Sequence, residues 1–356
     1  MRIVHAVRSD GYAGVEAHVA RLARAQSAAG HRVVVVGGAA RTGATAGAAV
    51  CHREAASTAD VVRGLRATAG DADVVHVHMT AAEVAATLAG LTRRLPPVVS
   101  TRHFAGVRGH GPGARLTAAV ARRHVVAQVA ISAYVAAHVD GRSTVVHPGL
   151  DPRPDGPPAA AREPVVLVVQ RLEPEKRTDV AVRAFAASGL AGHGWRLVVA
   201  GAGSQATELR GLAAGLGVGD AVDLLGARDD VEQLMTRAGV LLAPCPVEGL
   251  GLTVLEAMAS GLPVVAADAG GHRETLAGLD PLALHPPLDA ADAGERLAAL
   301  AADPARRDTY AGAARARQRA AFTVDQQAAA TDAVYRVATG AVPARRGAGR
   351  PAEETR

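Results

Sequence analysis

Short runs of β-branched and other apolar residues alternate along the chain with longer alanine-rich segments. In the first half the apolar runs cover residues 3–7, 32–37, 73–78, 97–101, 128–132 and 143–147. The segments between them have the helical type of pattern, as in residues 14–30, where Gly30 marks the expected end of a helix. Strands that alternate with helices in this way predict a parallel sheet covered by helices on both faces.

The same alternation restarts in the second half, after a segment without periodicity. Apolar runs recur at residues 164–170, 195–201, 221–226, 239–244 and 263–268. Residues 151–164 are dominated by proline, glycine and alanine, which is typical of a linker. The pattern therefore predicts an α/β protein of two doubly wound, Rossmann-like domains that face each other across a cleft.

We place the domains as follows from this pattern. The first domain covers residues 1–150, the linker 151–164, and the second domain 165–310. Helices over residues 311–340 are expected to cross back to the first domain, and residues 341–356 are expected to form a disordered tail. In such sheets, ligands bind at the carboxyl ends of the strands.

The charge distribution limits the classes of binding partner, and the cysteine content indicates the cellular compartment. Residues 1–150 contain 17 arginines against 8 acidic residues, whereas the rest of the 356 residues contains 22 basic against 26 acidic residues. A basic first half suits a phosphate-bearing substrate or an anionic membrane; no nucleic-acid-binding signature is present, so we expect no nucleic-acid partner. Only Cys51 and Cys245 occur, and no apolar run suits a signal peptide or a bilayer span, which predicts a cytoplasmic protein.

A cationic loop follows the first strand of the second domain. It carries Arg171, Lys176 and Arg177, and a helix is expected to begin near Thr178. Lys176 is the single lysine in a chain that otherwise uses arginine, which favours a site that needs a compact ammonium group. Cations beside a helix N-terminus suit a diphosphate, although a solvated loop would show the same composition.

The segment EGLGLTVLE, residues 248–256, contains two carboxylates with seven residues between them. A helix is expected to begin near Gly251, which would point the free amides of Leu252 and Thr253 at phosphate oxygens. Ionised Glu248 and Glu256 accept hydrogen bonds only, so hydroxyl groups are their natural partners. Phosphates between two hydroxylated rings describe a nucleotide sugar. In the alternative interpretation, Glu248 is a surface residue and Glu256 pairs with an arginine.

Taken together, these stretches resemble the retaining nucleotide-sugar glycosyltransferases of family 4, or group 1, which have the GT-B fold. The similarity rests on Arg171 and Lys176 in RLEPEKR, on the Glu-x7-Glu segment, and on the following EAMASGLPVVAADAGGHRE. It extends over residues 3 to 335. The resemblance implies transfer of a hexose-type sugar, from a UDP- or GDP-linked donor, to an acceptor hydroxyl with retention of configuration and without a metal or cofactor.

The resemblance also implies roles for individual residues. Arg171 and Lys176 would neutralise the departing diphosphate, Glu256 would hold the ribose, and Glu248 would hold the transferred sugar. His103 falls near the reacting sugar, which makes it, with Arg171, Lys176 and Glu248, a candidate catalytic residue. The other expected donor-binding residues are Gly14, Gly249, Leu250, Gly251, Leu252 and Thr253.

Two positions depart from the family pattern. Ala13 stands where the family usually has the first of two glycines before Val-Glu, which raises a question about the conformation of that phosphate loop. The usual asparagine near the linker is replaced by His147 and Pro148.

Three alternatives remain at this stage. The pattern Gly201-x-Gly203-x-x-Ala206 is that of an NAD(P)-dependent oxidoreductase, but it follows the second strand of its domain and lacks an acidic residue at the end of the next strand. A nucleotide-sugar epimerase of the same fold and an inactive sugar-binding module are the others. Two further pairs carry less weight: Asp71 and Asp73 suit a solvated turn, and His76 and His78 lack an evident third zinc ligand.

The acceptor stays open among a lipid, a glycan and a small metabolite. Arginines cluster between residues 93 and 123, and residues 112–127 can form a basic, partly apolar helix suited to anionic lipid. Peripheral contact with the inner face of the membrane is therefore one expectation. An arginine-rich surface without a lipid partner is the alternative.

Overall fold

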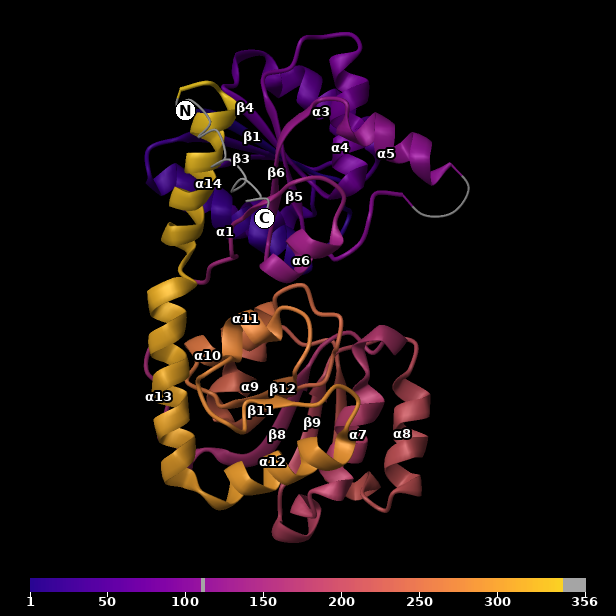
Figure 1. Ribbon diagram of the computed structural model, residues 1–356, viewed down its shortest axis with the longest axis vertical. Coiled ribbons are helices and arrows are strands. Elements are labelled where there is room, and N and C mark those ends of the chain that lie inside the picture. Colours follow the sequence, from indigo (N-terminus) through magenta and orange to yellow (C-terminus); the bar gives the residue numbers. More distant parts are fainter. Residues whose placement is uncertain (110–112, 342–356) are drawn as a thin grey trace, which may run out of the picture.

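The computed structural model describes residues 1–109 and 113–341, which form two α/β domains stacked one above the other (Figure 1). The sheet of the first domain has the strand order β3-β2-β1-β4-β5-β6-β7, with every pair parallel. Its strands are β1 (Arg2–Val7), β2 (Arg32–Val36), β3 (Cys51–Arg53), β4 (Val74–His78), β5 (Val98–Arg102), β6 (Val125–Ala130) and β7 (Thr144–Val145). Its helices are α1 (Gly14–Ala28), α2 (Ala40–Ala46), α3 (Thr58–Thr68), α4 (Met79–Gly90), α5 (Ala114–Arg122) and α6 (Ala133–His138).

The sheet of the second domain is also parallel, with the order β10-β9-β8-β11-β12-β13. Its strands are β8 (Glu163–Val169), β9 (Arg196–Ala200), β10 (Val222–Gly226), β11 (Ala238–Ala243), β12 (Val264–Ala267) and β13 (Leu284–His285). Its helices are α7 (Thr178–Ala187), α8 (Ala206–Gly215), α9 (Val231–Arg237), α10 (Leu252–Ala259), α11 (His272–Leu276) and α12 (Ala290–Ala302). Both sheets are thus doubly wound, as the alternating pattern predicted.

The strand predictions differ from the structure mainly at the short elements. All the apolar runs form strands, but β3 and β13 were not expected because two or three residues are too few to show a period of two. Strand β8 already begins at Glu163, inside the segment expected to be linker, because its first residues pair with Ala238 of β11.

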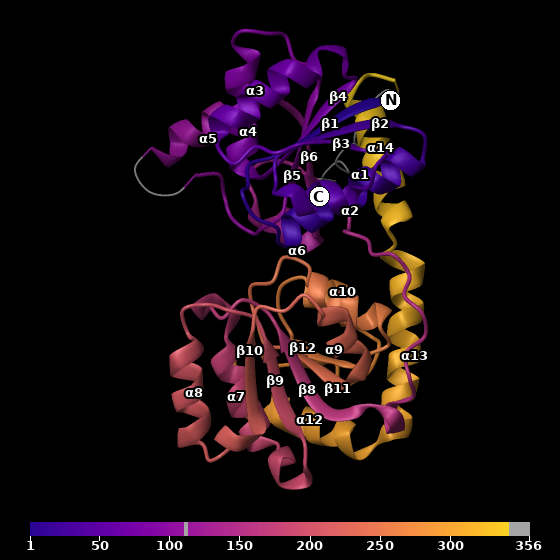
Figure 2. The same cartoon turned by 180° about the vertical axis from the view of Figure 1, so that it is seen from behind.

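Two long helices, α13 (Pro304–Ala321) and α14 (Val324–Ala338), connect the domains along one side (Figures 1 and 2). Helix α13 packs on α10, whereas α14 packs on α1, β5 and β6. Val334 and Tyr335 of α14 are buried in the core of the first domain. The expected disordered tail, residues 341–356, lies outside the described residues except for Ala341. Within the described ranges, none of the helices has the length and hydropathy of a membrane span.

Candidate active site

A cavity of about 400 Å³ lies between the domains, where the carboxyl edges of the two sheets face each other. The first domain contributes the loop before α1 and the residues that follow β5 and β6; the second contributes the loops that follow β8 and β11. The lining includes Gly14, His18, His103, Gln170, Arg171, Lys176, Cys245, Glu248, Leu250, Gly251, Leu252, Thr253 and His272. Most of the residues singled out in the sequence therefore meet in one place.

The central charged pair of this cavity is Lys176 with Glu248, whose Nζ and Oε2 atoms are 2.7 Å apart. Burial opposes the charge on Lys176, but Glu248 outweighs burial and raises the pKa of the ammonium above its usual value. Burial likewise opposes the charge on Glu248, while Lys176 holds the pKa of the carboxyl below its usual value. Both groups therefore stay ionised in a largely buried site.

The cationic loop is built as expected at its two ends. Lys176 ends a short 3-10 turn, and α7 begins at Thr178. Gln170 braces the loop, because its Nε2 donates to the carbonyl of Lys176 and to Oγ1 of Thr178, both at 2.9 Å. Arg171 lines the cavity but is 67% exposed and pairs with Glu175 at 2.8 Å, so its guanidinium remains accessible to a ligand.

Gly251 allows the backbone to turn into α10. It has a φ of +92° and directly precedes Leu252, the first helical residue. The first-turn amides of Leu252, Thr253 and Val254 have no partner within the helix by position, and all three residues line the cavity. This geometry suits an anion at the positive end of the helix.

The glycine pair before α11 supports the Glu248 loop and does not face the cavity. Gly271 donates from its amide to the carbonyl of Glu248 at 2.9 Å. A Cβ atom on Gly270 would lie 2.4 Å from that same carbonyl oxygen, and one on Gly271 would lie 2.3 Å from the Cα of Leu250. These glycines are therefore needed for close packing of two loops.

Glu256 and Gly249 lie beside the cavity and are absent from its lining. The Oε1 atom of Glu256 is 3.9 Å from the guanidinium of Arg21, on α1 of the opposite domain. Burial raises the pKa of Glu256, although Arg21 and Arg153 act against it. Gly249 contacts the first domain, because its carbonyl accepts from Oγ of Ser132 at 2.6 Å.

The loop before α1 shows why alanine is accepted at position 13. Ala13 has a φ of −140°, which is extended backbone open to any residue, and its amide donates to Glu16 at 2.9 Å. Gly14 lies opposite α10, since a Cβ atom there would be 3.5 Å from Cδ1 of Leu252. The question that the sequence raised about this loop conformation is thereby answered.

His147 and Glu274 join the two domains. Nε2 of His147 is 3.0 Å from Oε2 of Glu274, and the same carboxylate accepts from the amides of Ala133 and Tyr134 at 2.8 Å. Glu274, on α11 of the second domain, thus caps α6 of the first domain. The role of His147, at the unusual position near the linker, was not foreseen from the sequence.

Buried histidines were the main feature that sequence reasoning missed. His5, His18 and His103 gather around His76 and His78, so the third neighbour that those two lacked in the sequence is present in space. Burial and then Arg102 lower the pKa of His103 to about 3. The sequence does contain one indication of this cluster: His5 and His76 lie in apolar runs that form the neighbouring strands β1 and β4, where they are paired in register.

The two glycines that suggested a dinucleotide have a structural role. A Cβ atom on Gly201 would lie 1.8 Å from the carbonyl oxygen of Gln170, and one on Gly203 would lie 2.4 Å from that of Leu172. They let the loop after β9 pack against the cationic loop. Asp73 accepts from the amide of Arg2 at 2.7 Å, which fits the solvated turn expected for that segment.

The fold is that of a two-domain α/β protein with a cavity lined by the facing edges of both sheets. Two family descriptions match adjoining parts of the chain: "Glycosyltransferase Family 4" over residues 12–153, and "Glycosyl transferases group 1" over residues 154–317. The chain belongs to this family of glycosyltransferases, and the oxidoreductase interpretation of the Gly201 loop is not supported.

Individual relatives match shorter stretches. An exopolysaccharide phosphotransferase of Streptomyces coelicolor is 36% identical over 148 residues, which cover 41% of this chain and 16% of that protein. A GDP-mannose-dependent phosphatidylinositol monomannoside mannosyltransferase of Mycobacterium tuberculosis is 37% identical over 151 residues, 36% of this chain and 39% of that one. The chain thus spans well under half the length of these curated relatives.

A solved structure matches nearly the whole chain. The Anabaena protein HepE, in complex with UDP and glucose, is 21% identical and superposes with a TM-score of 0.78. The match covers 94% of this chain and 99% of that one. At this identity the similarity establishes the fold, which is the GT-B arrangement expected from the sequence.

Proposed function

We propose that the protein transfers a hexose-type sugar from a nucleoside-diphosphate sugar to an acceptor hydroxyl. The observation that carries this proposal is the buried Lys176–Glu248 pair beside the N-terminus of α10, in the cavity between the domains. A cation and helix amides suit the diphosphate, and a carboxylate suits sugar hydroxyls. Family membership supports transfer rather than epimerisation or passive binding.

The chemistry follows from the leaving group. As the bond between the anomeric carbon and phosphate breaks, negative charge grows on the β-phosphate. Lys176, Arg171 and the α10 amides are suited to stabilise that charge, which is the reason we propose catalysis without a metal. Glu256 would bind the ribose once a ligand displaces its contact with Arg21, and Glu248 would bind the transferred sugar.

Retention of anomeric configuration and a UDP- or GDP-linked donor complete the proposal. Retention rests on family resemblance, and NMR of the anomeric proton in the first-formed product would test it. The bound UDP and glucose of HepE and the GDP-mannose dependence of the mycobacterial relative support the two donor types.

We also propose an acceptor at or near an anionic membrane. Helix α5 exposes Arg115, Leu116 and Arg122, and Val107 is exposed in the segment before it. Basic and apolar side chains on one short helix suit an anionic lipid surface. A glycan or a small metabolite is the acceptor if no such surface is bound.

The donor site is tested by calorimetric titration with UDP, GDP, ADP, dTDP and NAD in the presence of EDTA. We expect one nucleoside diphosphate to bind the wild type, and Lys176→Met and Glu256→Ala to weaken it at least about tenfold, or about 1.4 kcal/mol. The matched control is Glu208→Ala, an exposed glutamate on α8, which should bind normally.

Two outcomes would contradict this proposal. Binding of NAD alone would restore the oxidoreductase interpretation. Binding that requires a divalent cation, or that both site variants leave unchanged, would show that the cationic loop does not hold the diphosphate.

A further inference from the structure

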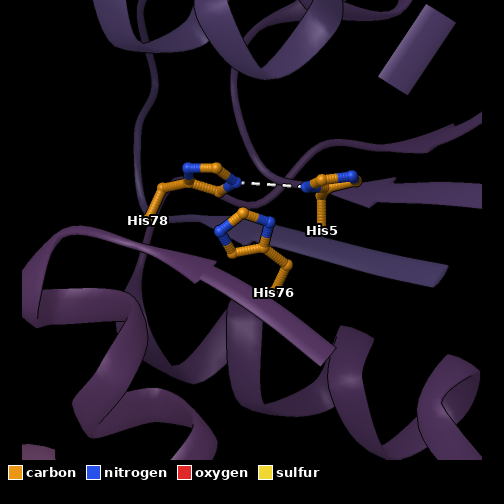
Figure 3. A group of neighbouring side chains, drawn as sticks. All are labelled: His5, His76 and His78. Carbon is orange, nitrogen blue, oxygen red and sulfur yellow. Dashed lines mark hydrogen bonds between the residues drawn. The ribbon is translucent and has the colours of Figure 1, made fainter. Parts of the chain in front are cut away.

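A line of buried hydrogen bonds leads from the cavity into the first domain. Nε2 of His103 is 3.1 Å from Nδ1 of His78, and Nε2 of His78 is 3.1 Å from Nδ1 of His5. Figure 3 shows the rings of His5 and His78 edge to edge, joined by this second bond. The three residues come from β1, the end of β4 and the position after β5, so neighbouring strands place them in a row.

The line continues to the C-terminal helix α14. Nε2 of His5 is 2.8 Å from Oε1 of Gln26, and Nε2 of Gln26 is 3.0 Å from Oδ1 of Asp332. All five side chains belong to buried residues, with Asp332 the most exposed at 8%. Five residues from five separate segments of the chain thus form one continuous path of buried side chains that begins at the cavity.

The carboxylate at the end gives this path a direction. A carboxylate only accepts, so the amide NH₂ of Gln26 must face Asp332 and its oxygen must face His5. His5 therefore carries its proton on Nε2 and accepts at Nδ1, because a neutral imidazole has one N–H. Burial favours that neutral form, since it lowers the pKa of His5 to about 4 and the pKa of His78 well below 6.5.

The same reasoning applies at each ring. His78 must donate from Nε2 to His5, which leaves its Nδ1 to accept from Nε2 of His103. The remaining nitrogen of His103, Nδ1, carries no proton and has no hydrogen-bond partner among the described residues. Its side chain lines the cavity.

We infer that Asp332, Gln26, His5 and His78 are positioning residues that hold His103 in a single tautomer, with Nδ1 as a hydrogen-bond acceptor for a ligand hydroxyl. This inference rests on the proposed function for the identity of that hydroxyl, which belongs to the donor sugar or to the acceptor. The tautomer itself follows from the contacts alone. His103 would accept a hydrogen bond, and it would reject a ligand group that can only accept.

Helix α14 orients the second cavity histidine in a similar way. The amide of Gly149 donates to Oε1 of Gln327 at 2.8 Å, which turns the NH₂ group of Gln327 toward His18. Nε2 of Gln327 is 3.1 Å from Nε2 and 3.5 Å from Nδ1 of His18, so the amide group faces the ring of His18. Helix α14 therefore contacts one cavity histidine through Gln327 and reaches the other through the path from Asp332.

A metal ion is the competing explanation for these histidines. Potential ligand atoms of His5, His76 and His78 lie within 4.8 Å of one another (Figure 3), and so do those of a second group, His18, His78 and His103. However, both nitrogens of His76 are already bonded, to the hydroxyl of Tyr335 at 2.6 Å and to Oγ1 of Thr101 at 2.7 Å. Both nitrogens of His78 are bonded as well, to His5 and to His103, each at 3.1 Å.

The test is long-range ¹H–¹⁵N NMR of the histidine rings in the full-length protein at pH 7.5. We expect His5, His78 and His103 to appear as neutral rings protonated at Nε2. A His103 ring protonated at Nδ1, or an even mixture of tautomers, would overturn the inference. Addition of Zn²⁺ should leave the spectrum unchanged. If Zn²⁺ changes the ¹⁵N chemical shifts of His5 and His78, these histidines form a metal site and the inference is wrong.

Three variants test the direction of the path. Gln26→Leu removes the acceptor for His5 and should convert His103 to a mixture of tautomers. Gln26→Glu keeps an acceptor for His5, because the new carboxyl and Asp332 would share one proton, and it should keep the Nε2-protonated form. This variant also provides a readout if the leucine variant does not fold. The matched control is Thr101→Val, which loses a buried bond to His76 off the path and should leave His103 unchanged.

Activity separates this inference from the proposed function. If sugar transfer is measured, Gln26→Leu should lower kcat about tenfold with the donor KM within about twofold, and Gln26→Glu should recover part of the loss. If His103 is protonated at Nε2 but the protein binds no nucleotide, the inference about the path stands and the proposed function is wrong. If the protein binds a nucleotide but His103 is protonated at Nδ1, the proposed function stands and the inference about the path is wrong.

Discussion

The cavity places its one ammonium group where two requirements meet. Lys176 neutralises the Glu248 carboxylate, and under the proposed function it also contacts the donor diphosphate. Its Nζ is 2.7 Å from Glu248 and its side chain is 19% exposed, so a planar guanidinium of larger size has little room there. This is a physical reason for a lysine in a chain whose other cationic side chains are all arginine.

We expect Lys176→Arg to weaken nucleoside diphosphate binding about tenfold, because the larger group must displace Glu248 or the neighbouring loop. The same titration calorimetry used for the donor site measures it. Arg177→Lys is the matched control, since Arg177 pairs with Asp179 and is absent from the cavity lining. Wild-type affinity in Lys176→Arg would show that only the charge matters at this position.

Individual site residues could be predicted only where a local motif carried them. Lys176, Glu248 and the turn at Gly251 lie within a few residues of a strand end, so the sequence alone indicates their place. The line from His103 to Asp332 has no such motif. It depends on the lateral order of β1, β4 and β5 and on where a helix more than 200 residues away packs, which no local pattern reports.

Helix α5 is the element with the clearest unexplained surface. Leu116 is 70% exposed on it, and the loop that leads toward it exposes Val107 at 63%. Arg122 is also largely exposed, at 55%, and Arg123 follows it at the end of the helix. Exposed apolar side chains beside arginines suit an anionic lipid bilayer, whose interior is apolar and whose head groups are negatively charged.

We therefore expect the protein to bind vesicles of anionic phospholipid at low salt, and Arg122→Ser with Arg123→Ser to weaken binding about 30-fold, at about 1 kcal/mol for each charge. Co-sedimentation measures this. Arg183→Ser with Arg210→Ser removes the same charge from exposed helix positions of the second domain and should have little effect. If both double variants lose vesicle binding equally, or if the wild type does not bind vesicles, the membrane proposal is wrong and the acceptor is a glycan or a metabolite.

At the scale of the whole molecule, α14 completes the core of the first domain although it lies far from that domain in the sequence. It closes the core of the first domain with Tyr335 and holds two cavity histidines through Gln327 and Asp332. The strand–helix alternation predicted both sheets, because most of the strands are long enough to show their own period, although β3 and β13 are not. The packing partner of α14 could not be predicted in detail, because an amphipathic pattern shows which face of a helix is buried but not which element covers that face.

The buried histidine cluster also makes the stability of the whole protein depend on pH. Burial lowers the pKa of all five members, to about 4 for His5, to about 3 for His103, and well below 6.5 for His18, His76 and His78. Unfolded histidines bind protons near pH 6.5, whereas these folded ones do not. The unfolded state therefore holds more protons in that window, and stability falls as the pH falls.

We expect the free energy of unfolding to be near its full value above pH 7 and to decline as the pH drops from about 6.5 toward 4. A histidine that is protonated in the unfolded chain but neutral in the folded protein lowers stability by about 1.4 kcal/mol per pH unit, so the cluster should make this decline steep. Urea unfolding at pH 7.5, 6.5, 6.0 and 5.5 measures the slope. His76→Gln should reduce it by about 1.4 kcal/mol per pH unit, and measurements between pH 7 and 8 serve as the internal control. A flat profile between pH 6.5 and 5.5 would mean that the folded cluster takes up protons as readily as the unfolded chain, which the buried hydrogen bonds of His5, His78 and His103 do not allow.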